Sequence, residues 1–324
     1  MTNETTSEPA APRQSPEAIV ATSVLRRSRS RWRIAAFLAL ALAVVALAGR
    51  FALESRNGAN SDYIARINID GTIATDPTRL RMLNDLGEDD HVKAVLIAIN
   101  SPGGTTAGGE ELYEALSALR ARKPVVTTIK ELGASAAYMT AIASDRIFAR
   151  RLSLVGSIGV LYQNVDAGKL LDTIGVNMEK VATGPLKAEP DFTGPIKPEV
   201  RASLESLVGD SFDWFIDIVS ERRGLTKPQT LALADGRIMT GRQGVEAKLI
   251  DDVGGEAEAV AWLESDKGVA KDLPVYTRYP LPDQGFGWLG KLIGSEARSA
   301  LGLNATGPIV LDGLVSLWQV GPAS

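Results

Sequence analysis

The sequence predicts an α/β domain built on a mainly parallel β-sheet and preceded by one N-terminal transmembrane helix. Short β-branched runs alternate with segments of helical periodicity, and strands that alternate with helices favour parallel pairing. The run from Val92 to Ile99 is apolar almost throughout, as expected for a central parallel strand with both faces covered. The transmembrane helix is predicted by an apolar run that follows a cluster of arginines.

Composition removes several classes of function. The chain has 324 residues, a net charge of −4, no cysteine and a single histidine, His91. The lack of cysteine excludes a thiol nucleophile, disulfides and thiolate metal sites. The acidic charge gives no reason to expect a nucleic-acid partner. A serine–histidine–aspartate triad would have to use His91, which we interpret as a solvated loop residue.

The N-terminal part divides into three segments. We expect residues 1–33 to form a disordered basic cytoplasmic head, residues 34–53 a transmembrane anchor, and residues 54–61 a linker. The arginines that precede the apolar run place the N-terminus in the cytoplasm and the rest of the chain beyond the membrane. A removable signal sequence cleaved after Ala48 is the alternative interpretation.

From Tyr63 onward, short strands and helices alternate. The periodicity of the last predicted helix puts an apolar stripe on one side, which we expect to pack on the sheet. The predicted strands are residues 63–69, 92–99 and 125–129. Two helices are predicted over residues 77–86 and 198–223, and a third begins at Ser135. A further helix is predicted by the apolar face of Leu112, Ala115, Leu116 and Leu119.

The stretch from Lys130 to Asp145 contains the first candidate site residue. The strand Val125–Ile129 is predicted to stop at a turn containing Gly133, and a helix of small residues begins at Ser135. A serine at such a junction lies beside helical N–H groups that have no intrahelical acceptor, and these groups can hold an oxyanion. Close helix packing is the alternative explanation for the small residues.

A pair of glycines follows the neighbouring strand. Because the carboxyl ends of parallel strands meet at one edge of a sheet, Gly103 and Gly104 are predicted to lie near Ser135. One N–H from this pair and the N–H of Ala136 would supply the two donors of an oxyanion hole. A tight strand-to-helix turn is the alternative role for the glycines.

Several motifs occur in a fixed order and together resemble the short bacterial signal peptide peptidase SppA family, serine–lysine peptidases of the ClpP/crotonase fold. The resemblance covers roughly residues 62–265 and leaves residues 266–324 as a C-terminal extension of unassigned role. The motifs are Asn-Ser-Pro-Gly-Gly-Thr at 100–105, Gly-Ala-Ser-Ala-Ala-Tyr-Met at 133–139, Asp-Arg-Ile-Phe-Ala at 145–149, Val-Gly-Ser-Ile-Gly-Val at 155–160, Thr-Gly-Pro-Leu-Lys-Ala at 183–188, Asp-Gly-Arg-Ile-Met-Thr-Gly-Arg-Gln-Gly at 235–244 and Leu-Ile-Asp-Asp-Val-Gly at 249–254.

The resemblance implies a mainly parallel sheet with repeated ββα units and a role for each site residue. It implies that Ser135 is the nucleophile, Lys187 the general base and Ser157 the hydroxyl that orients the lysine amine. It also implies that the amides of the glycine pair and of Ala136 hold the oxyanion. The sequence departs from the family where Ala-Ala stands for the familiar Gly-Gly after the nucleophile, and the two added methyl groups narrow the pocket there.

The surroundings of Lys187 support its assignment. A lysine acts as a base only when neutral, and burial in an apolar site lowers its pKa from the reference value of about 10.4. Lys187 lies among prolines and small apolar residues, as expected for a stiff loop. The alternative is a surface lysine paired with Glu189. Three rival bases have less suitable flanks: Lys130, Lys180 and Lys197.

The resemblance therefore predicts a membrane-anchored serine endopeptidase that needs no metal or organic cofactor. It implies peptide substrates such as cleaved signal peptides, and a homo-oligomer in which neighbouring subunits supply Ser135 and Lys187. The anchor places the catalytic domain on the periplasmic side of the inner membrane. The alternatives are a crotonase-type acyl-CoA enzyme and a non-catalytic scaffold. In the tail, the apolar segment Val310–Val320 is a strand or helix at an oligomer surface, or an amphipathic membrane contact.

Overall fold

The computed structural model describes residues 36–44, 61–280 and 314–317, and the chain divides into two compact units, Met1–Ser61 and Asp62–Ser324. In the first unit, residues 36–44 form an exposed helix. The predicted anchor, residues 34–53, lies partly outside the described residues. Within the described ranges, no helix combines the length and the apolar character needed to cross a membrane.

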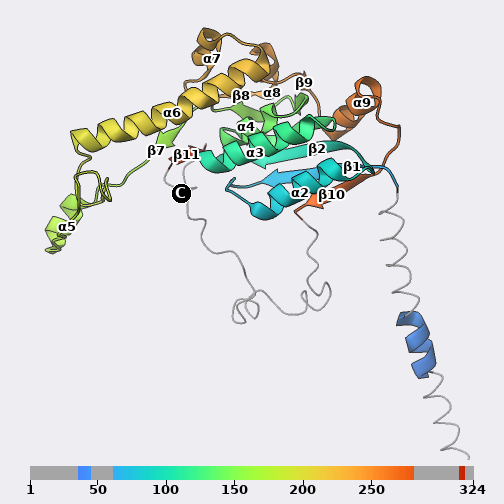
Figure 1. Ribbon diagram of the computed structural model, residues 1–324, viewed down its shortest axis with the longest axis horizontal. Coiled ribbons are helices and arrows are strands. Elements are labelled where there is room, and N and C mark those ends of the chain that lie inside the picture. The colour runs from blue at the N-terminus through green and yellow to red at the C-terminus, as the bar shows by residue number, and fades with distance from the viewer. Residues whose placement is uncertain (1–35, 45–60, 281–313, 318–324) are drawn as a thin grey trace, which may run out of the picture. The chain divides into compact units, whose positions relative to one another are not determined.

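The main sheet of the second unit confirms the predicted parallel architecture (Figure 1). Within the described residues, six strands follow the order β10-β1-β2-β4-β5-β9, with every neighbouring pair parallel. Strand β6 adds in parallel to the end of β4, and β8 pairs antiparallel with β6. The arrangement fits a ClpP-like fold. The strands are β1 (Tyr63–Asp70), β2 (Val92–Ser101), β4 (Val125–Ala134), β5 (Arg146–Ala149), β6 (Leu154–Gly156), β8 (Ile238–Thr240), β9 (Asp252–Val253) and β10 (Val275–Tyr279).

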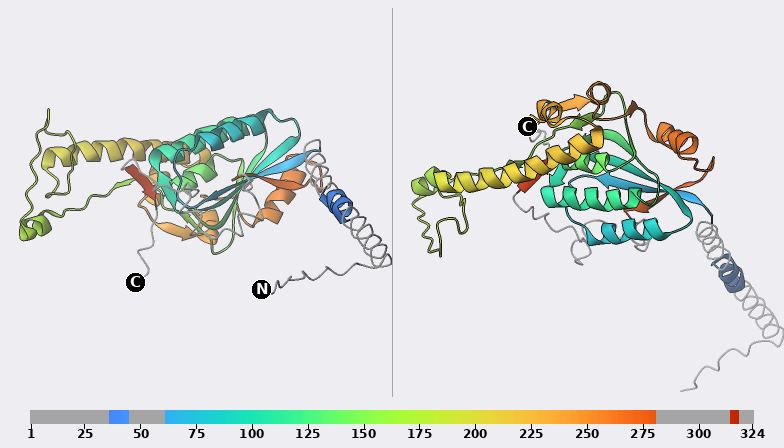
Figure 2. Two further views of the ribbon diagram at one scale, coloured as in Figure 1. Left: turned by 90° about the horizontal axis from the view of Figure 1, so that it is seen from below. Right: turned by 45° about the horizontal axis from the view of Figure 1, so that its top comes forward.

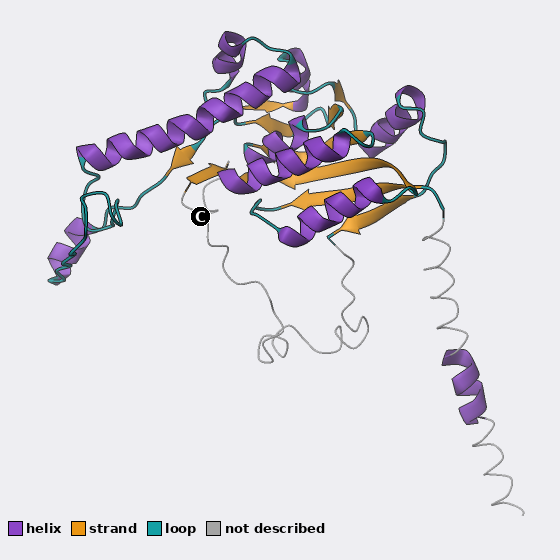
Figure 3. Cartoon of the chain, in the orientation of Figure 1, coloured by secondary structure: helices purple, strands orange, loops and turns teal. Residues whose placement is uncertain are grey.

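Helices cover both faces of this sheet (Figure 3). On one face, α2 (Pro77–Glu88), α3 (Thr106–Arg120), α4 (Ala136–Ile142) and the end of α6 (Pro198–Arg223) share a core with alternate residues of β1 and β2. On the other face, α9 (Glu256–Asp266) packs on the intervening residues. The alternation follows from the two-residue period of a strand. The other helices of the described second unit are α5 (Gly168–Ile174), α7 (Lys227–Leu233) and α8 (Gly241–Glu246).

A second, three-stranded sheet lies beside the carboxyl ends of the main strands. Strand β11 (Leu314–Leu317) lies between β3 (Gly103–Thr105) and β7 (Leu161–Tyr162) and is antiparallel to both. Of the two secondary structures expected within Val310–Val320, the structure therefore has the strand. The C-terminal part of the chain thus returns to the glycine pair at residues 103 and 104.

Helix α6 corrects one prediction from the sequence. Only its C-terminal half packs on the sheet domain, where Phe215 and Val219 are fully buried. The N-terminal half leaves the domain, and Leu207 of the predicted stripe keeps 48% of its surface exposed. Both views in Figure 2 show α6 projecting, with α5 and the chain between α5 and α6 at its outer end. We call residues 163–211 the arm.

The predicted elements correspond to β1, α2, β2, α3, α4 and α6, with one further difference in β4. The strand does not stop at a turn containing Gly133 but continues to Ala134. It can continue because it changes neighbour: Val126 to Ile129 pair with β5, whereas Leu132 to Ala134 pair with β6. This change brings β6 to the residue that precedes Ser135.

Candidate active site

Ser135 occupies a strained turn between β4 and α4. It is the N-cap residue of α4 with φ 59° and ψ −122°, and only 1% of its surface is exposed. A non-glycine residue with positive φ costs of the order of 1–3 kcal/mol and persists where the surroundings impose it. Its N–H donates to the carbonyl oxygen of Gly156 at 2.8 Å. Strained strand-to-helix turns of this type present the serine nucleophiles of α/β-hydrolases.

The helix that follows Ser135 is held tightly from within the domain. The hydroxyl of Tyr138 donates to the carbonyl oxygen of Leu249 at 2.7 Å, and Tyr138 is fully buried. Burial raises the pKa of this phenol, which therefore stays protonated as a donor. Gly109 of α3 has no room for a side chain, because a Cβ there would lie 3.0 Å from the Cβ of Ala136. The close approach of α3 fixes the first turn of α4.

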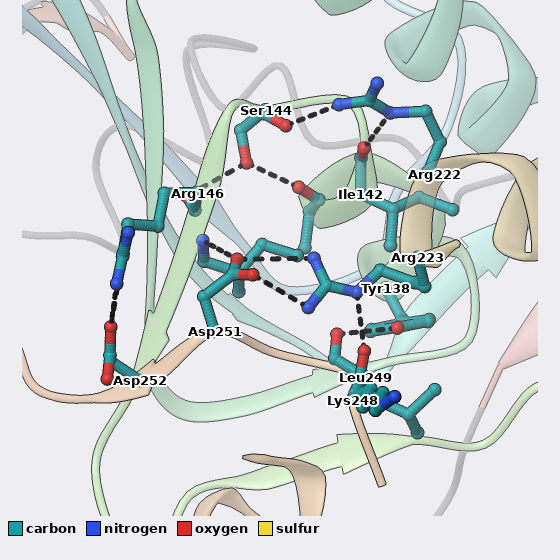
Figure 4. A network of polar contacts seen from close by, with 12 residues as sticks. Tyr138, Ile142, Ser144, Arg146, Arg222, Arg223, Lys248, Leu249, Asp251 and Asp252 are labelled. Atoms are coloured by element: carbon teal, nitrogen blue, oxygen red, sulfur yellow. Dashed lines mark hydrogen bonds and ion pairs between the residues drawn. The ribbon is translucent and has the colours of Figure 1, made fainter. Parts of the chain in front are cut away.

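Two arginines at the end of α6 bind this helix to the sheet domain, Arg222 at the end of α4 and Arg223 at Asp251 (Figure 4). The guanidinium of Arg222 donates to the carbonyl oxygens of Ile142 at 2.8 Å and Ser144 at 2.7 Å, which lie at the C-terminus of α4. Arg223 donates to both carboxylate oxygens of Asp251, at 2.9 and 3.2 Å. Helix α4 is therefore fixed at both ends by buried or half-buried polar contacts.

Of the two glycines, Gly104 is the one whose peptide N–H points to the edge of β3 opposite Ile73. At one edge of β3, Ile73 donates its N–H to Gly103 O at 2.8 Å and accepts the N–H of Thr105 at 2.9 Å. Successive peptide groups of a strand point to opposite edges, so the N–H and carbonyl of Gly104 face the opposite edge. A Cβ at Gly104 would lie 1.8 Å from the carbonyl oxygen of Ile73. Only glycine fits there.

Ser101 supports the glycine pair and was not found from the sequence. Its buried hydroxyl accepts the N–H of Gly103 at 3.1 Å, which occupies that amide. Ser101 also pairs in register with Gly133, one strand away. The signal in the sequence is a serine that precedes Pro-Gly-Gly at a strand end.

Ser157 lies beside Ser135 at the end of β6. It follows Gly156, whose carbonyl oxygen accepts the N–H of Ser135. Ser157 also has a positive φ of 50°, and its N–H donates to Arg237 O at 2.8 Å. The side chain of Arg237 pairs with Asp235, which lowers the pKa of that carboxyl to about 2 and keeps the turn bridged by an ion pair. Thus the motifs at 155–160 and 235–244 form one substructure.

Lys187 does not lie beside Ser135 within this one chain. It is exposed and sits in a turn where its N–H donates to the carbonyl oxygen of Gly184 at 3.2 Å. The segment that carries it, residues 175–197, lies at the outer end of α6 in Figures 1 and 2, whereas α4 packs near the inner end. From Val200 to Phe215 alone, α6 rises by about 22 Å.

The rival bases are all engaged in ion pairs. Lys180 contacts Glu189 at 2.5 Å and Asp191 at 2.9 Å, and Lys197 contacts Glu189 at 3.3 Å. The hydrogen bond to Glu189, together with that to Asp191, raises the pKa of Lys180, which keeps it charged. Lys130 lies 3.9 Å from Asp70. Glu189 is thus a partner of Lys180 and Lys197.

His91 lies at the wrong end of the sheet for a role beside Ser135. It precedes β2, and its Nδ1 is 3.4 Å from Asp62. The strand β2 separates it from Ser101 by about 30 Å. The structure therefore brings together Ser135, Ala136, Ser157 and the glycine pair, and leaves His91 and Lys187 apart from them.

Comparisons with known proteins identify the family. The model of peptidase family S49 matches residues 117–270. The chain is 34% identical to "Putative protease MJ0651" of Methanocaldococcus jannaschii over 63% of the chain and 65% of that protein. It is 34% identical to "Putative protease slr0021" of Synechocystis sp. over 64% of the chain and 76% of that protein. It is 29% identical to "Putative signal peptide peptidase SppA" of Enterococcus faecium over 73% of each chain.

The matched family segment contains β4, Ser135 and α4, so the strained serine lies inside the region that defines the family. The alignment with the Synechocystis protein combines 34% identity with coverage of three quarters of that relative. The chain therefore belongs to peptidase family S49, the SppA-like serine-type peptidases.

Proposed function

We propose that this chain is a membrane-anchored endopeptidase in which Ser135 is the nucleophile and Lys187 the general base. The observation that carries the proposal is the strained conformation of Ser135 at the buried turn between β4 and α4. Membership in a peptidase family argues against the acyl-CoA and scaffold alternatives. The ion pairs of Lys130, Lys180 and Lys197 leave Lys187 as the best-suited base among these lysines.

The proposed reaction follows serine–lysine chemistry. Neutral Lys187 takes the proton of Ser135 Oγ as the oxygen bonds to the substrate carbonyl carbon. The N–H groups of Gly104 and Ala136 stabilise the resulting oxyanion. Lys187 then gives its proton to the leaving nitrogen as the C–N bond breaks, and it next deprotonates the water that hydrolyses the acyl-enzyme. Ser157 orients the lysine amine.

A second subunit supplies Lys187 in this proposal. Large apolar side chains are exposed along the arm, an arrangement that in soluble domains marks an interaction surface. Covering this surface by a neighbouring copy would both bury it and carry a lysine to the partner's serine. The exposed residues are Val165, Leu170, Ile174, Val176, Met178, Val181, Leu186, Phe192 and Leu207.

The substrates we propose are hydrophobic peptide segments such as cleaved signal peptides. The proposal follows the name of the Enterococcus faecium relative. Residues 34–53 would anchor the enzyme in the bacterial inner membrane with the N-terminus in the cytoplasm, which would place the active site close to such segments on the other side.

Labelling with a serine-directed acylating inhibitor tests the assignment. The assembled protein should give one adduct, mapped by peptide mass spectrometry to Ser135, and the Lys187→Ala variant should give none. A Lys169→Ala variant, which removes another arm lysine, serves as the control and should label normally. An adduct on another serine, or unchanged labelling of Lys187→Ala, would contradict the proposal.

A further inference from the structure

The segment between β1 and α2, residues 71–76, supports β3 along one edge. Ile73 of this segment forms two backbone hydrogen bonds with β3, one to Gly103 and one from Thr105. Gly104 packs against the same residue, because a Cβ there would lie 1.8 Å from the carbonyl oxygen of Ile73. The position of Ile73 therefore sets the position of the Gly104 peptide, which the proposed mechanism uses as an oxyanion donor.

A buried arginine holds the residue next to Ile73. Arg79 of α2 has only 5% of its surface exposed, and its guanidinium donates to the carbonyl oxygen of Ala74 at 2.7 Å. Helix α3 also packs closely on Ala74, since a Cβ at Gly108 would lie 2.8 Å from the Ala74 Cα. A buried charge without partners is strongly destabilising, so an arginine at this place must be held by its contacts.

Three further side chains surround this guanidinium. Glu111 of α3 lies 3.5 Å from it, and the same carboxylate oxygen accepts the N–H of Asp76 at 2.8 Å. Asp76 is the N-cap of α2, where its carboxylate accepts the N–H of Arg79 at 3.1 Å. The ring of Tyr279 on β10 has its centroid 5.9 Å from the guanidinium carbon, and its hydroxyl donates to Asp76. We call Asp76, Arg79, Glu111 and Tyr279 the arginine network.

The arginine network lies at the edge of the sheet that carries the candidate active site. Asp76 follows the end of β1, and Tyr279 is the last residue of β10. Both strands run parallel to β2 and β4, which lead to Gly103 and Ser135. Because the carboxyl ends of parallel strands meet at one edge, the network is close to the site although the proposed reaction uses none of its side chains.

We propose that Arg79 is a positioning residue for the oxyanion hole, acting through Ala74 and Ile73 on the N–H of Gly104. The inference rests on the proposed function. Without the guanidinium, residues 71–76 would shift and carry β3 with them. A donor displaced by a fraction of an ångström stabilises the charge on the transition-state oxygen less well. Binding of the uncharged substrate carbonyl depends much less on this donor, so the loss falls on kcat.

Kinetics of a matched pair of arginine variants test the proposal. Arg79→Met keeps a long side chain and removes its donors, and in the full chain it should lower kcat for a fluorogenic peptide about tenfold with KM unchanged. The control is Arg66→Met, which removes a half-buried arginine of β1 paired with Glu256 and Thr277, and it should retain the wild-type kcat. An equal loss of kcat in both variants, or a raised KM with unchanged kcat in Arg79→Met, would overturn the proposal.

A milder variant keeps the test decisive if Arg79→Met does not fold. Arg79→Lys retains the positive charge and can reach one acceptor, but an amine does not span Ala74 and Glu111 as the planar guanidinium does. It should lower kcat about threefold with KM unchanged. A wild-type kcat in every Arg79 variant that folds would overturn the proposal.

A peptide aldehyde separates this inference from the proposed chemistry. Serine Oγ bonds to the aldehyde carbon, the C=O π bond breaks and the serine proton passes to the base, which leaves an oxyanion beside Gly104. The Ki of the aldehyde should rise about tenfold in Arg79→Met, whereas the Kd of the matching peptide amide for Ser135→Ala should be the same with and without Arg79→Met.

The two possible failures of the aldehyde experiment differ. An adduct mapped to Ser135 with the same Ki in the wild type and in Arg79→Met would contradict the positioning role and leave the nucleophile assigned. The lack of an adduct at Ser135 in the wild type would contradict the proposed nucleophile and, with it, the inference about Arg79.

Discussion

The turn that carries Ser135 and the arm that carries Lys187 differ in almost every physical respect. All seven residues of α4 are buried, and the helix is held by Tyr138 at one end and Arg222 at the other. The arm exposes large apolar side chains, and its polar contacts are ion pairs among its own residues, such as Lys180 with Glu189. One region is complete within a single chain, whereas the other has a surface suited to a partner.

The difference between the two regions shows which part of the enzyme is rigid within a single chain. A nucleophile must be held in reacting geometry by the surrounding packing, and in the proposed mechanism the sheet domain would provide this packing for Ser135. A lysine base needs an environment that lowers its pKa, and an exposed turn does not offer one. A neighbouring subunit that buries the arm would provide this environment. The proposed division of labour therefore requires assembly for activity.

The largest expected effect is the loss of the nucleophile. Ser135→Ala should lower kcat/KM for a peptide substrate at least about 1,000-fold, because the remaining site can only bind and polarise the carbonyl. Ser265→Ala on α9 removes an exposed hydroxyl and should leave the rate unchanged. Circular dichroism should show the same fold for both. Comparable turnover by the two variants would contradict the assignment of Ser135 as the nucleophile.

Two glycine substitutions compare the site with the arm directly. Gly104→Ala should lower kcat about 100-fold or more, because its Cβ collides with the Ile73 carbonyl and moves an oxyanion donor. Gly209→Ala lies on the exposed half of α6, where a Cβ would contact nothing, and should stabilise the helix by about 0.5–1 kcal/mol. Steady-state kinetics and thermal melts measure the two effects. Equal activity of both variants would contradict the proposed role of Gly104 as an oxyanion donor.

A hydrogen bond around α4 should also contribute more to the free energy of unfolding than a hydrogen bond in the arm. Tyr138→Phe removes the donor to the carbonyl of Leu249 and leaves a buried acceptor unpaired, which should cost about 1–3 kcal/mol of unfolding free energy. Ser211→Ala removes a hydroxyl on exposed α6 and should change stability by less than about 0.5 kcal/mol. Urea denaturation measures both. A Tyr138→Phe protein as stable as wild type would show that this contact is not needed.

Acid should loosen the arm before the sheet domain. Hydrogen bonds from Thr193 and Lys180 lower the pKa of Asp191, and that from Lys180 lowers the pKa of Glu189. Groups with lowered pKa stabilise the fold above their ordinary pKa, near 4, and that stabilisation is lost as the pH falls below this value. Hydrogen-exchange protection of residues 175–197 should therefore drop below about pH 4 while α4 stays protected.

A charge-removing variant provides the control for this pH effect. Asp191→Asn cannot form the charged pair with Lys180, so its arm should already show reduced protection at neutral pH. Protection that is the same at pH 3 and pH 6 in the wild-type arm, after correction for intrinsic exchange, would contradict the role of these ion pairs.

Local patterns in the sequence predicted the strand before Ser135 and the helix after it, although not the length of the strand. The β-branched run Val125–Ile129 and the small residues after Ser135 define a strand and a helix by short-range rules, and β4 and α4 confirm them. Contacts between distant motifs were not predictable in this way. The bond from Ser157 to Arg237 joins residues 80 positions apart, and its existence depends on the pairing of β6 with β8.

The arm shows a second limit of sequence periodicity. An apolar stripe indicates that a helix face meets an apolar partner, but it does not say whether the partner belongs to the same chain. The stripe of α6 packs on the domain at Phe215 and Val219, whereas Leu207, nearer the N-terminus of the helix, does not pack on it. The same limit applies to the apolar tail segment, because its pairing with β3 depends on a strand edge more than 200 residues away in the sequence.

The most direct test of the central claim is subunit complementation. Ser135→Ala and Lys187→Ala proteins are prepared alone and co-expressed at equal levels, and peptidase activity is measured for each assembly. If each site combines the serine of one subunit with the lysine of another, random mixing restores about a quarter of wild-type activity, although each variant alone is inactive. Mixed assemblies that stay inactive would contradict the shared site and place the working base in the same chain as Ser135.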